Sequence, residues 1–261
     1  MRKQEIEKLY KELLSDDIES IGFNFLKNTF QKKNIPNSPS NKIPKSWKKV
    51  YFKTYPRLPQ TKLEKLNPKE NQLFSIIKKR KSERKFTGKD LTLKEISKIL
   101  YFAAGIRNSK EMKGDLDRSK RMYPSAGARY PLEVYPVIFK GKEILPGIYH
   151  YNVKWNTLEL LLKGDFKKKF SNEITNQNWI EKSGMLIIIT AVFSRTIIKY
   201  KERGWRYIFF EAGHMAQNIY LISTLLKLNC CAIGGFLDEK LIQLLDLNPK
   251  SELPLYLLAI G

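Results

Sequence analysis

The longest apolar stretch of this 261-residue chain runs from Met185 to Phe193, and it limits the folds that the sequence can adopt. A helix that crosses a membrane needs about 18 or more apolar residues, so this stretch is too short to be one. Its isoleucine and valine content instead predicts a buried β-strand. We therefore expect this segment to be a central strand of a sheet.

Shorter segments with strand or helix character lie on both sides of that stretch. Thr92 and Glu95 form a capping-box pattern at the start of one helix, and Gly105 is expected to end it in the left-handed conformation. Strands and helices do not alternate strictly, so we predict an α+β fold and not a doubly wound sheet. No Gly-x-Gly-x-x-Gly motif follows a strand, which argues against the usual dinucleotide-binding fold. The remaining predicted strands are 132–139, 147–151, 157–161, 230–233 and 255–260, and the other helices lie near 71–80, at 206–228 and after 238.

The formal net charge of the chain is +22. Such a charge permits binding to nucleic acid, anionic lipid or an acidic peptide. The lysines are scattered, however, and the chain has no zinc-finger or RNP motif. We therefore favour a solvated basic surface and do not expect nucleic acid as a partner.

The N-terminus lacks the apolar core of an export signal, and we expect a cytoplasmic protein. Cys230 and Cys231 are adjacent, which suits neither a disulfide framework nor a zinc site. We expect two buried thiols and no metal site.

Residues 1–69 differ in composition from the rest of the chain. Residues 1–22 have the apolar spacing of a helix, and the stretch from Pro36 to Pro59 is rich in proline, asparagine, serine and lysine. We therefore predict an N-terminal helix and an extended arm over residues 1–69, followed by a folded domain over residues 70–261.

A basic segment, Arg-Lys-Ser-Glu-Arg, occupies positions 80–84. Arg80 and Arg84, with Ser82 between them, could hold a phosphate dianion through bidentate contacts and a hydroxyl donor. Basic residues are also common at the ends of helices, where they complement the helix dipole. From the residues alone, both interpretations stay open.

The first of two segments of small residues could let a flat ring approach the backbone. Positions 124–131 read Pro-Ser-Ala-Gly-Ala-Arg-Tyr-Pro, and Ser125 can donate a hydrogen bond there. An ordinary loop that enters a strand is the alternative. The second segment, Ile-Gly-Gly-Phe, follows the predicted strand at 230–233.

In this order, the segments resemble those of the FMN-dependent nitroreductase superfamily. Positions 80–86 are similar to its opening motif, Arg-Arg/His-Ser-x-Arg/Lys-x-Phe, and positions 121–135 and 145–151 look most like its SagB-type azoline dehydrogenases. The resemblance implies a mostly antiparallel central sheet flanked by helices, an intertwined homodimer and FMN as the cofactor. The FMN-binding residues that it implies are Arg80, Lys81, Ser82, Arg84, Pro124, Ser125, Ala126, Gly127, Ile233, Gly234 and Gly235.

Lys199 and Tyr200 stand in the phrase Lys-Tyr-x-x-Arg-Gly-x-Arg-Tyr. A lysine beside a tyrosine can lower the pKa of the phenol, so the pair could act as an acid or a base, although most such dipeptides do not. In the azoline dehydrogenases a Lys-Tyr pair at this place in the motif order is catalytic. The resemblance therefore implies that Lys199 and Tyr200 are the catalytic pair.

The predicted helix at 206–228 is mostly apolar but carries three polar residues that we place on one face, namely Glu211, His214 and Asn218. We expect His214 to be a hydrogen-bonded structural residue. In the family that the chain resembles, the corresponding helix builds much of the homodimer interface, and two chains complete each flavin site.

The activity implied by the resemblance is the oxidation of thiazoline or oxazoline rings in a peptide to azoles. A peptide substrate and a cyclodehydratase partner would follow from it. An NAD(P)H-dependent nitro or quinone reductase of the same fold is the first alternative. A basic nucleic-acid-binding or scaffold protein with a vestigial flavin pocket is the second.

Overall fold

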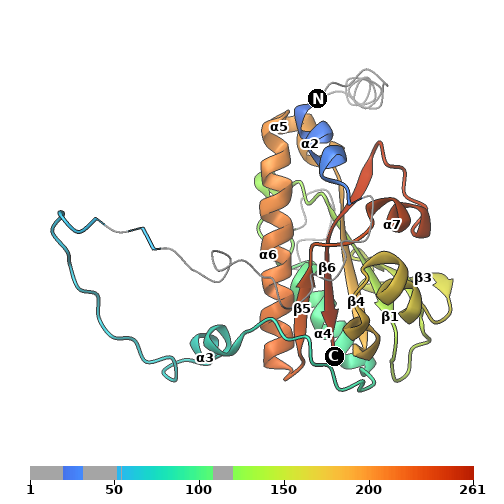
Figure 1. Cartoon of the computed structure of the whole chain (residues 1–261), viewed down its shortest axis with the longest axis horizontal. Helices are drawn as coiled ribbons and strands as arrows, with labels where there is room; N and C mark the ends of the chain where they lie inside the picture. The colour runs from blue at the N-terminus through green and yellow to red at the C-terminus, as the bar shows by residue number, and fades with distance from the viewer. Residues whose placement is uncertain (1–19, 32–51, 54, 108–119) are drawn as a thin grey trace, which may run out of the picture.

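The computed structural model describes residues 20–31, 52–53, 55–107 and 120–261, and a six-stranded sheet lies at its centre (Figure 1). The strand order is β3-β2-β1-β4-β6-β5, and every neighbouring pair is antiparallel. The predicted α+β class with an antiparallel sheet is thus confirmed. The strands are β1 Leu132–Ile138, β2 Gly147–Asn152, β3 Thr157–Lys163, β4 Met185–Val192, β5 Cys230–Ile233 and β6 Glu252–Ile260.

β4 is the apolar stretch from which the fold was predicted. It pairs with β1 along one edge and with β6 along the other, so it lies inside the sheet. All its residues except Val192 are buried. The predicted central strand is therefore confirmed, and its apolar character follows from burial on both faces.

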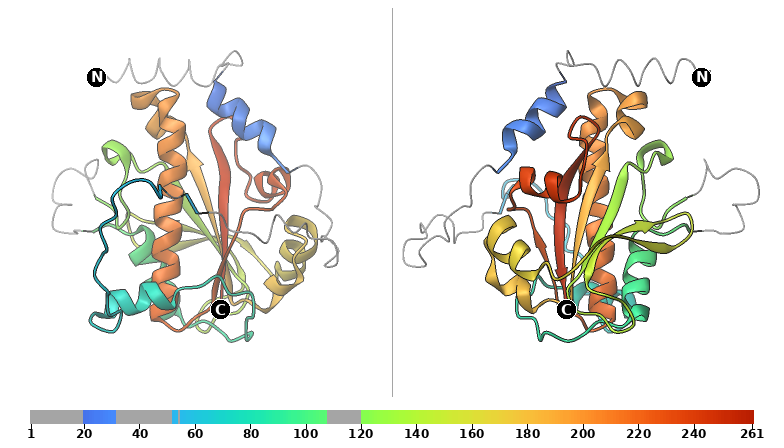
Figure 2. Two further views of the ribbon diagram at one scale, coloured as in Figure 1. Left: turned by 60° about the vertical axis from the view of Figure 1, so that its left-hand side comes forward. Right: turned by 90° about the vertical axis from the view of Figure 1, so that its right-hand side faces the viewer.

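Helices cover the two faces of the sheet in separate layers (Figure 2). One face packs against α4 Leu93–Ala104 and the long helix α6 Arg203–Leu225, and α5 Ser194–Tyr200 leads directly into α6. The other face carries α7 Asp238–Leu244 and two short helices, η6 Lys169–Ile174 and η7 Asn178–Lys182. Each face thus has its own buried apolar cluster.

The start of α4 is as predicted and its end is not. Thr92 and Glu95 form the reciprocal hydrogen bonds of a capping box. Gly105, however, has a φ of −63° and is not left-handed. A Cβ at this position would lie 2.5 Å from the carbonyl oxygen of Tyr101, so the glycine is required by this close approach and not by the handedness of the turn.

Two helices, α2 near the start of the described chain and α5 after β4, were not predicted at their observed positions. α2 Ile21–Thr29 packs against α6: the Trp205 indole donates a hydrogen bond to Ser20 Oγ over 3.0 Å, and a side chain at Gly22 would overlap that indole. α5 was also missed, and α6 ends three residues before the predicted limit. Lys227, with a φ of 60°, turns the chain from α6 towards β5. The helix predicted for residues 1–22 and the stretch 36–51 of the predicted arm lie mostly outside the described residues.

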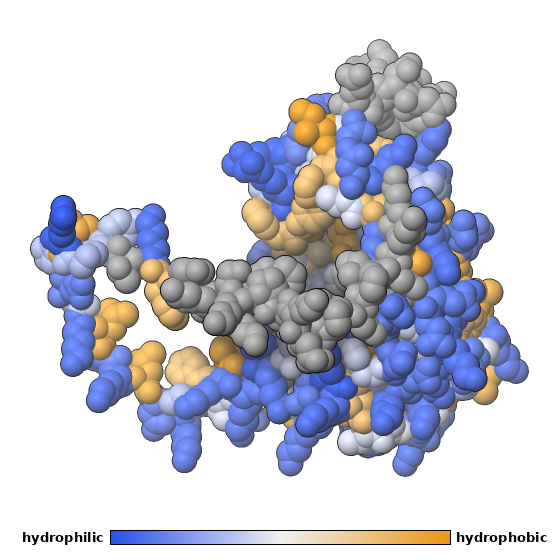
Figure 3. Space-filling view, viewed as in Figure 1, coloured by the Kyte–Doolittle hydropathy of each residue, from blue (hydrophilic) through white to orange (hydrophobic). Residues whose placement is uncertain are grey.

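Residues 52–53 and 55–66 contain no helix or strand, and α3 Gln72–Lys79 follows them. No residue of α3 is buried, and apolar side chains are exposed along the arm and the helix (Figure 3). These exposed residues are Phe52, Tyr55, Leu58, Leu63, Leu66, Leu73, Phe74 and Ile77. Among the described helices, none is long and apolar enough to cross a membrane.

Candidate functional site

The basic segment after α3 runs beside β5 and is tied to it. The backbone N–H of Glu83 donates a hydrogen bond to the carbonyl of Cys230 over 2.9 Å. Ser82 Oγ and Tyr220 Oη form a 2.9 Å hydrogen bond, and the same phenol oxygen accepts the backbone N–H of Ala232 at 2.7 Å. Ser82 is thus fixed where α6 meets β5.

The two arginines of this segment lie over aromatic rings. The Arg80 guanidinium is 5.4 Å from the centre of the Tyr220 ring, and that of Arg84 is 5.9 Å from the centre of the Trp179 ring. Neither arginine forms an ion pair with another described residue, whereas Lys81 Nζ is 2.9 Å from a carboxylate oxygen of Glu83. Both guanidinium groups can therefore bind an added anion without breaking a salt bridge.

The two cysteines of β5 lie next to the same segment. Both are free thiols and both are buried, as predicted. Burial raises the pKa of Cys230 and of Cys231, although Arg80 and Arg84 oppose this by favouring the thiolates. These cysteines therefore remain protonated structural thiols rather than nucleophiles.

The small-residue loop before β1 is held by α6. It contains a short helical turn, η5 Ala126–Ala128, in which Gly127 has a φ of 58°. Ser125 Oγ accepts a 2.8 Å hydrogen bond from the backbone N–H of Tyr130. The backbone N–H of Ala126 donates to Glu211 Oε1 over 3.0 Å. The left-handed conformation at Gly127 is one that glycine adopts without steric cost, while Pro124 is exposed at the entrance of the loop.

The predicted catalytic pair packs against this loop. Lys199 and Tyr200 are the last two residues of α5. A Cβ at Gly127 would lie 2.5 Å from Tyr200 Oη and 2.8 Å from Lys199 Nζ, so a glycine is required for the observed approach. Lys199 Nζ is 5.2 Å from the centre of the Tyr200 ring, which packs edge-on against Tyr207 at 5.0 Å. The structure thus brings together two motifs that are far apart in the sequence.

Glu211 is a residue of this region that the sequence reasoning did not select. Its side chain is buried, at 2% exposure, and Oε2 has no hydrogen-bond partner within the described chain. Burial raises its pKa to about 7, against the opposing effect of hydrogen bonds from Ala126 and Ser125. The signal that could have identified it is an acidic residue within an apolar helical run.

Glu211, His214 and Asn218, which their spacing places on one face of α6, differ in burial. Glu211 is buried and His214 is exposed, because the boundary of the buried face of α6 falls between these two positions. His214 makes no hydrogen bond to any described residue, so the expected structural bond is not found. Asn218 lies between the two in exposure and donates a 3.3 Å hydrogen bond to the carbonyl of Met122.

The glycine turn after β5 leaves its backbone open to approach. Ile233, the last residue of β5, is buried, whereas a Cβ at Gly234 would meet nothing within 4 Å. A Cβ at Gly235 would lie 3.4 Å from Gln31 Oε1. Neither glycine has a positive φ, so the backbone conformation does not require glycine at these positions. Their lack of side chains instead lets another group come close to the main chain.

The predicted site residues form two groups, and each group is held by a residue of α6. The phosphate-grip group comprises Arg80, Ser82, Arg84 and the turn after β5, and it is anchored by Tyr220. The loop group comprises positions 124–127 and the Lys-Tyr pair, and it is anchored by Glu211. About two and a half helical turns separate Glu211 from Tyr220, so the anchors point to opposite flanks of α6. No hydrogen bond or ion pair between described residues joins the two groups.

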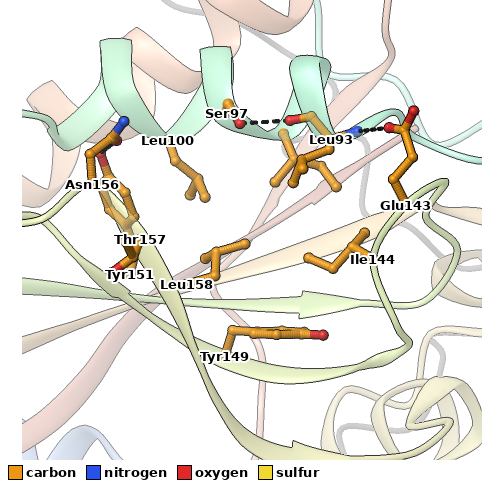
Figure 4. Close-up of a pocket in the computed structure, with 11 residues that line it drawn as sticks. Leu93, Ser97, Leu100, Glu143, Ile144, Tyr149, Tyr151, Asn156, Thr157 and Leu158 are labelled. Atoms are coloured by element: carbon orange, nitrogen blue, oxygen red, sulfur yellow. Dashed lines mark hydrogen bonds between the residues drawn. The ribbon is translucent and has the colours of Figure 1, made fainter.

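A cavity of about 340 Å³ lies elsewhere, between α4 and the β2–β3 hairpin (Figure 4). It contains none of the predicted site residues. The hydroxyls of Tyr149 and Tyr151 already donate to Leu145 and Asn156, over 2.9 and 2.6 Å. We assign no chemistry to this cavity. Its lining residues are Leu93, Ile96, Ser97, Leu100, Glu143, Ile144, Tyr149, Tyr151, Asn156, Thr157 and Leu158.

Comparison with known proteins gives a family match over most of the chain. Residues 77–261 match the family described as the nitroreductase family. A Methanocaldococcus jannaschii protein that carries a nitroreductase name is 32% identical over 192 residues, which are 74% of this chain and 91% of that protein. The part of the chain that matches the family contains both groups of predicted site residues, and the predicted arm lies before it.

A second kind of relative carries a name that refers to trifolitoxin processing. The trifolitoxin-processing protein TfxB of Rhizobium leguminosarum bv. trifolii is 28% identical over 170 residues. The match covers 62% of this chain but 45% of that protein, so the chain spans about half the length of this relative.

Two solved structures share the fold. The Escherichia coli microcin synthetase McbBCD complex with truncated pro-MccB17 contains a chain that this protein matches with a TM-score of 0.64 and 20% identity, over 100% of this chain and 94% of that one. A structure from Desulfovibrio desulfuricans that is in complex with FMN matches with a TM-score of 0.52 and 16% identity, over 74% of this chain and 86% of that one. At these identities the likeness shows the fold alone, and it confirms the predicted nitroreductase-like fold.

Proposed function

Because the chain belongs to the nitroreductase family, which makes it an oxidoreductase, we propose that it is an FMN-dependent dehydrogenase that oxidises thiazoline or oxazoline rings in a peptide to azoles. The observation that carries the proposal is the packing of Lys199 and Tyr200 against Gly127. It places a candidate proton-transfer pair next to the loop that the proposed cofactor would contact.

The described residues fit a flavin mononucleotide. Arg80 and Arg84 have no carboxylate partner among the described residues and would hold the phosphate, with the Ser82 hydroxyl beside them. The open backbone at Gly234 and the small-residue loop at 124–127 would receive the ring. Bound FMN would supply two-electron redox chemistry. The FMN-bound structure of similar fold agrees with this choice of cofactor.

The protein residues would handle the protons of the reaction. Converting an azoline to an azole removes one hydride equivalent and one proton from the ring. Tyr200 Oη is the candidate acceptor for that proton, and the ammonium of Lys199 lies beside the Tyr200 ring. Gly127 lets both groups come close to the loop backbone, which orients them.

A second copy of the chain would complete the site. The phosphate-grip group and the loop group point to opposite flanks of α6, so one chain does not assemble a single pocket from both. The arm and α3 also expose an apolar surface that would need a cover (Figure 3). We propose a homodimer in which the phosphate-grip group of one protomer faces the loop group of its partner.

We also propose that the protein acts in the cytoplasm.

Two relatives support a peptide as the substrate. One relative is named for the processing of trifolitoxin, and a solved structure of the same fold is a microcin synthetase complex with truncated pro-MccB17 bound. We therefore propose a peptide substrate whose azoline rings are made first by a cyclodehydratase. The basic surface of this chain, with a net charge of +22, would attract an acidic peptide.

An NAD(P)H-dependent nitro or quinone reductase is the second candidate. The relative that is matched over 91% of its length carries the nitroreductase name. A reductase would not need Lys199 and Tyr200 for proton transfer, so the two candidates make different predictions about this pair.

The experiment that separates them compares Lys199→Ala and Tyr200→Phe with the wild type in two assays. The assays are oxidation of a synthetic thiazoline-containing peptide and NADPH-driven reduction of a quinone. We expect each variant to keep FMN and to lose about 100- to 10,000-fold in azoline turnover, because removing a general acid or base has this effect. Lys201→Ala, which removes an exposed lysine next to the pair, is the matched control.

If the wild type oxidises no azoline and reduces quinones at the same rate as both variants, the reductase function replaces the proposed one. If quinone reduction falls with azoline oxidation in both variants, the pair supports the flavin site in general and the proton-transfer role is wrong.

A further inference from the structure

Glu211 is buried in α6 beneath the small-residue loop. It lies in the buried stripe of this helix together with apolar neighbours such as Ile208, Ala212 and Met215. One carboxyl oxygen accepts the backbone N–H of Ala126, and no described group bonds the other. A buried carboxyl with an unfilled oxygen is costly for the folded state, so this position calls for an explanation other than stability.

The carboxyl is linked through one residue to the proposed catalytic pair. The backbone N–H of Ala126 donates a hydrogen bond to Glu211. The next residue, Gly127, packs against Tyr200 Oη and Lys199 Nζ. A Cβ at Gly127 would lie 2.5 Å from Tyr200 Oη and 2.8 Å from Lys199 Nζ, so the loop backbone is in close approach to both groups. A small movement of the loop would therefore change this approach.

We propose that Glu211 is a positioning residue whose carboxylate holds the small-residue loop in place and thereby sets the distance between Gly127 and the Lys199–Tyr200 pair. This inference rests on the proposed function only for its effect on turnover. The anchoring of the loop is a property of the chain itself.

The anchor would respond to pH near neutrality. Burial raises the pKa of Glu211 to about 7. The ionised form accepts the hydrogen bond from the Ala126 N–H more strongly than the protonated form does. The hydrogen bond between the loop and this carboxyl should therefore strengthen as pH rises through about 7, although burial of the ionised carboxylate makes the folded state as a whole less stable. The titratable groups that face this region are the Tyr123 phenol, which interacts with Glu211, and, across the loop, Lys199 and Tyr200.

The first test measures the loop directly by hydrogen exchange at the amides of residues 125–130, with no substrate present. The variants are Glu211→Ala, which removes the anchor, and Glu211→Gln, which keeps an acceptor oxygen but cannot ionise. Glu173→Gln removes an exposed carboxylate elsewhere and is the matched control. We expect Glu211→Ala to exchange about tenfold faster in this loop, and the protection in Glu211→Gln to lose the step that the wild type shows at about pH 7.

The second test follows turnover of a synthetic thiazoline peptide by the FMN-loaded protein across the same pH range. We expect turnover of the wild type to rise through about pH 7, the profile of Glu211→Gln to lose that step, and Glu211→Ala to fall about 10- to 100-fold with KM little changed. A structural role alone would not remove the pH step.

Equal exchange and equal pH profiles in the wild type and Glu211→Gln would overturn the inference, and so would normal loop protection in Glu211→Ala. If the exchange results are as expected but no protein oxidises the thiazoline, the anchor stands and the proposed function fails. If Glu211→Ala does not fold, the pH profiles of Glu211→Gln decide alone.

Discussion

Replacing Glu211 with glutamine should change how the stability of the protein depends on pH. The pKa of Glu211 is raised from its ordinary 4.5 to about 7 by burial. An acid whose pKa is raised by folding favours the folded state below its unfolded pKa, and this contribution is lost as pH rises through the folded pKa. The full difference corresponds to about 3 kcal/mol of unfolding free energy, since each pKa unit is worth about 1.4 kcal/mol.

The measurement is urea-induced unfolding of the wild type and Glu211→Gln at about pH 5 and about pH 9. Part of the difference is already present at the lower pH, because the unfolded carboxyl is partly ionised there. We therefore expect the wild type to lose about 2.5 kcal/mol more than the variant between the two conditions. Glutamine should be the more stable residue at high pH, because the buried side chain then carries no charge.

Glu173→Gln is the control, since its exposed carboxylate should leave the pH dependence near that of the wild type. Parallel curves for the wild type and Glu211→Gln would show that the carboxyl is ionised without penalty in the folded protein. The burial argument, and with it the pH dependence of the proposed anchor, would then be refuted.

Three further results are expected. The protein should purify with non-covalent FMN that heat releases, and Arg80→Gln or Arg84→Gln should weaken FMN binding about 10- to 100-fold, as measured by flavin fluorescence; release of FAD would contradict this. Light scattering should give a dimer, and an equimolar mixture of Arg80→Gln and Tyr200→Phe that has exchanged subunits should contain about a quarter of wild-type sites only if each site is shared between protomers. Gly127→Ala should cost about 1 to 2 kcal/mol of unfolding free energy, because the position is left-handed, and most of the turnover, because a Cβ would displace Tyr200 Oη and Lys199 Nζ.

The parts of the fold that the sequence predicts are those with a local cause. β4 was found because burial on both faces requires an unbroken apolar run. The start of α4 was found because a capping box is complete within four residues. Gly105 was assigned the wrong cause, because its glycine answers a contact with the Tyr101 carbonyl that a sequence pattern does not show. Contacts between distant segments, such as the packing of α2 on Trp205, leave no periodic signal.

The same limit applies to the candidate site. Its motifs can be recognised in the sequence. The placement of Lys199 and Tyr200 against Gly127, however, follows only from the three-dimensional structure. Glu211 was noted as one of several polar residues on a helix face, but helical spacing alone does not show which of them is buried. The sequence therefore singles out the segments of the candidate site but not the buried Glu211 that is hydrogen-bonded to one of them.

α6 gives both groups of site residues the same kind of support. On one flank the carboxylate of Glu211 accepts the backbone N–H of Ala126, and on the other the phenol of Tyr220 accepts the backbone N–H of Ala232. Each bond fixes a main-chain segment that carries predicted cofactor contacts to one rigid helix. A site built on a helix is held more precisely than one built on loops alone. The distance between the two groups is therefore set by the helix, and in the proposed dimer the meeting of two such helices would set the geometry of each flavin site.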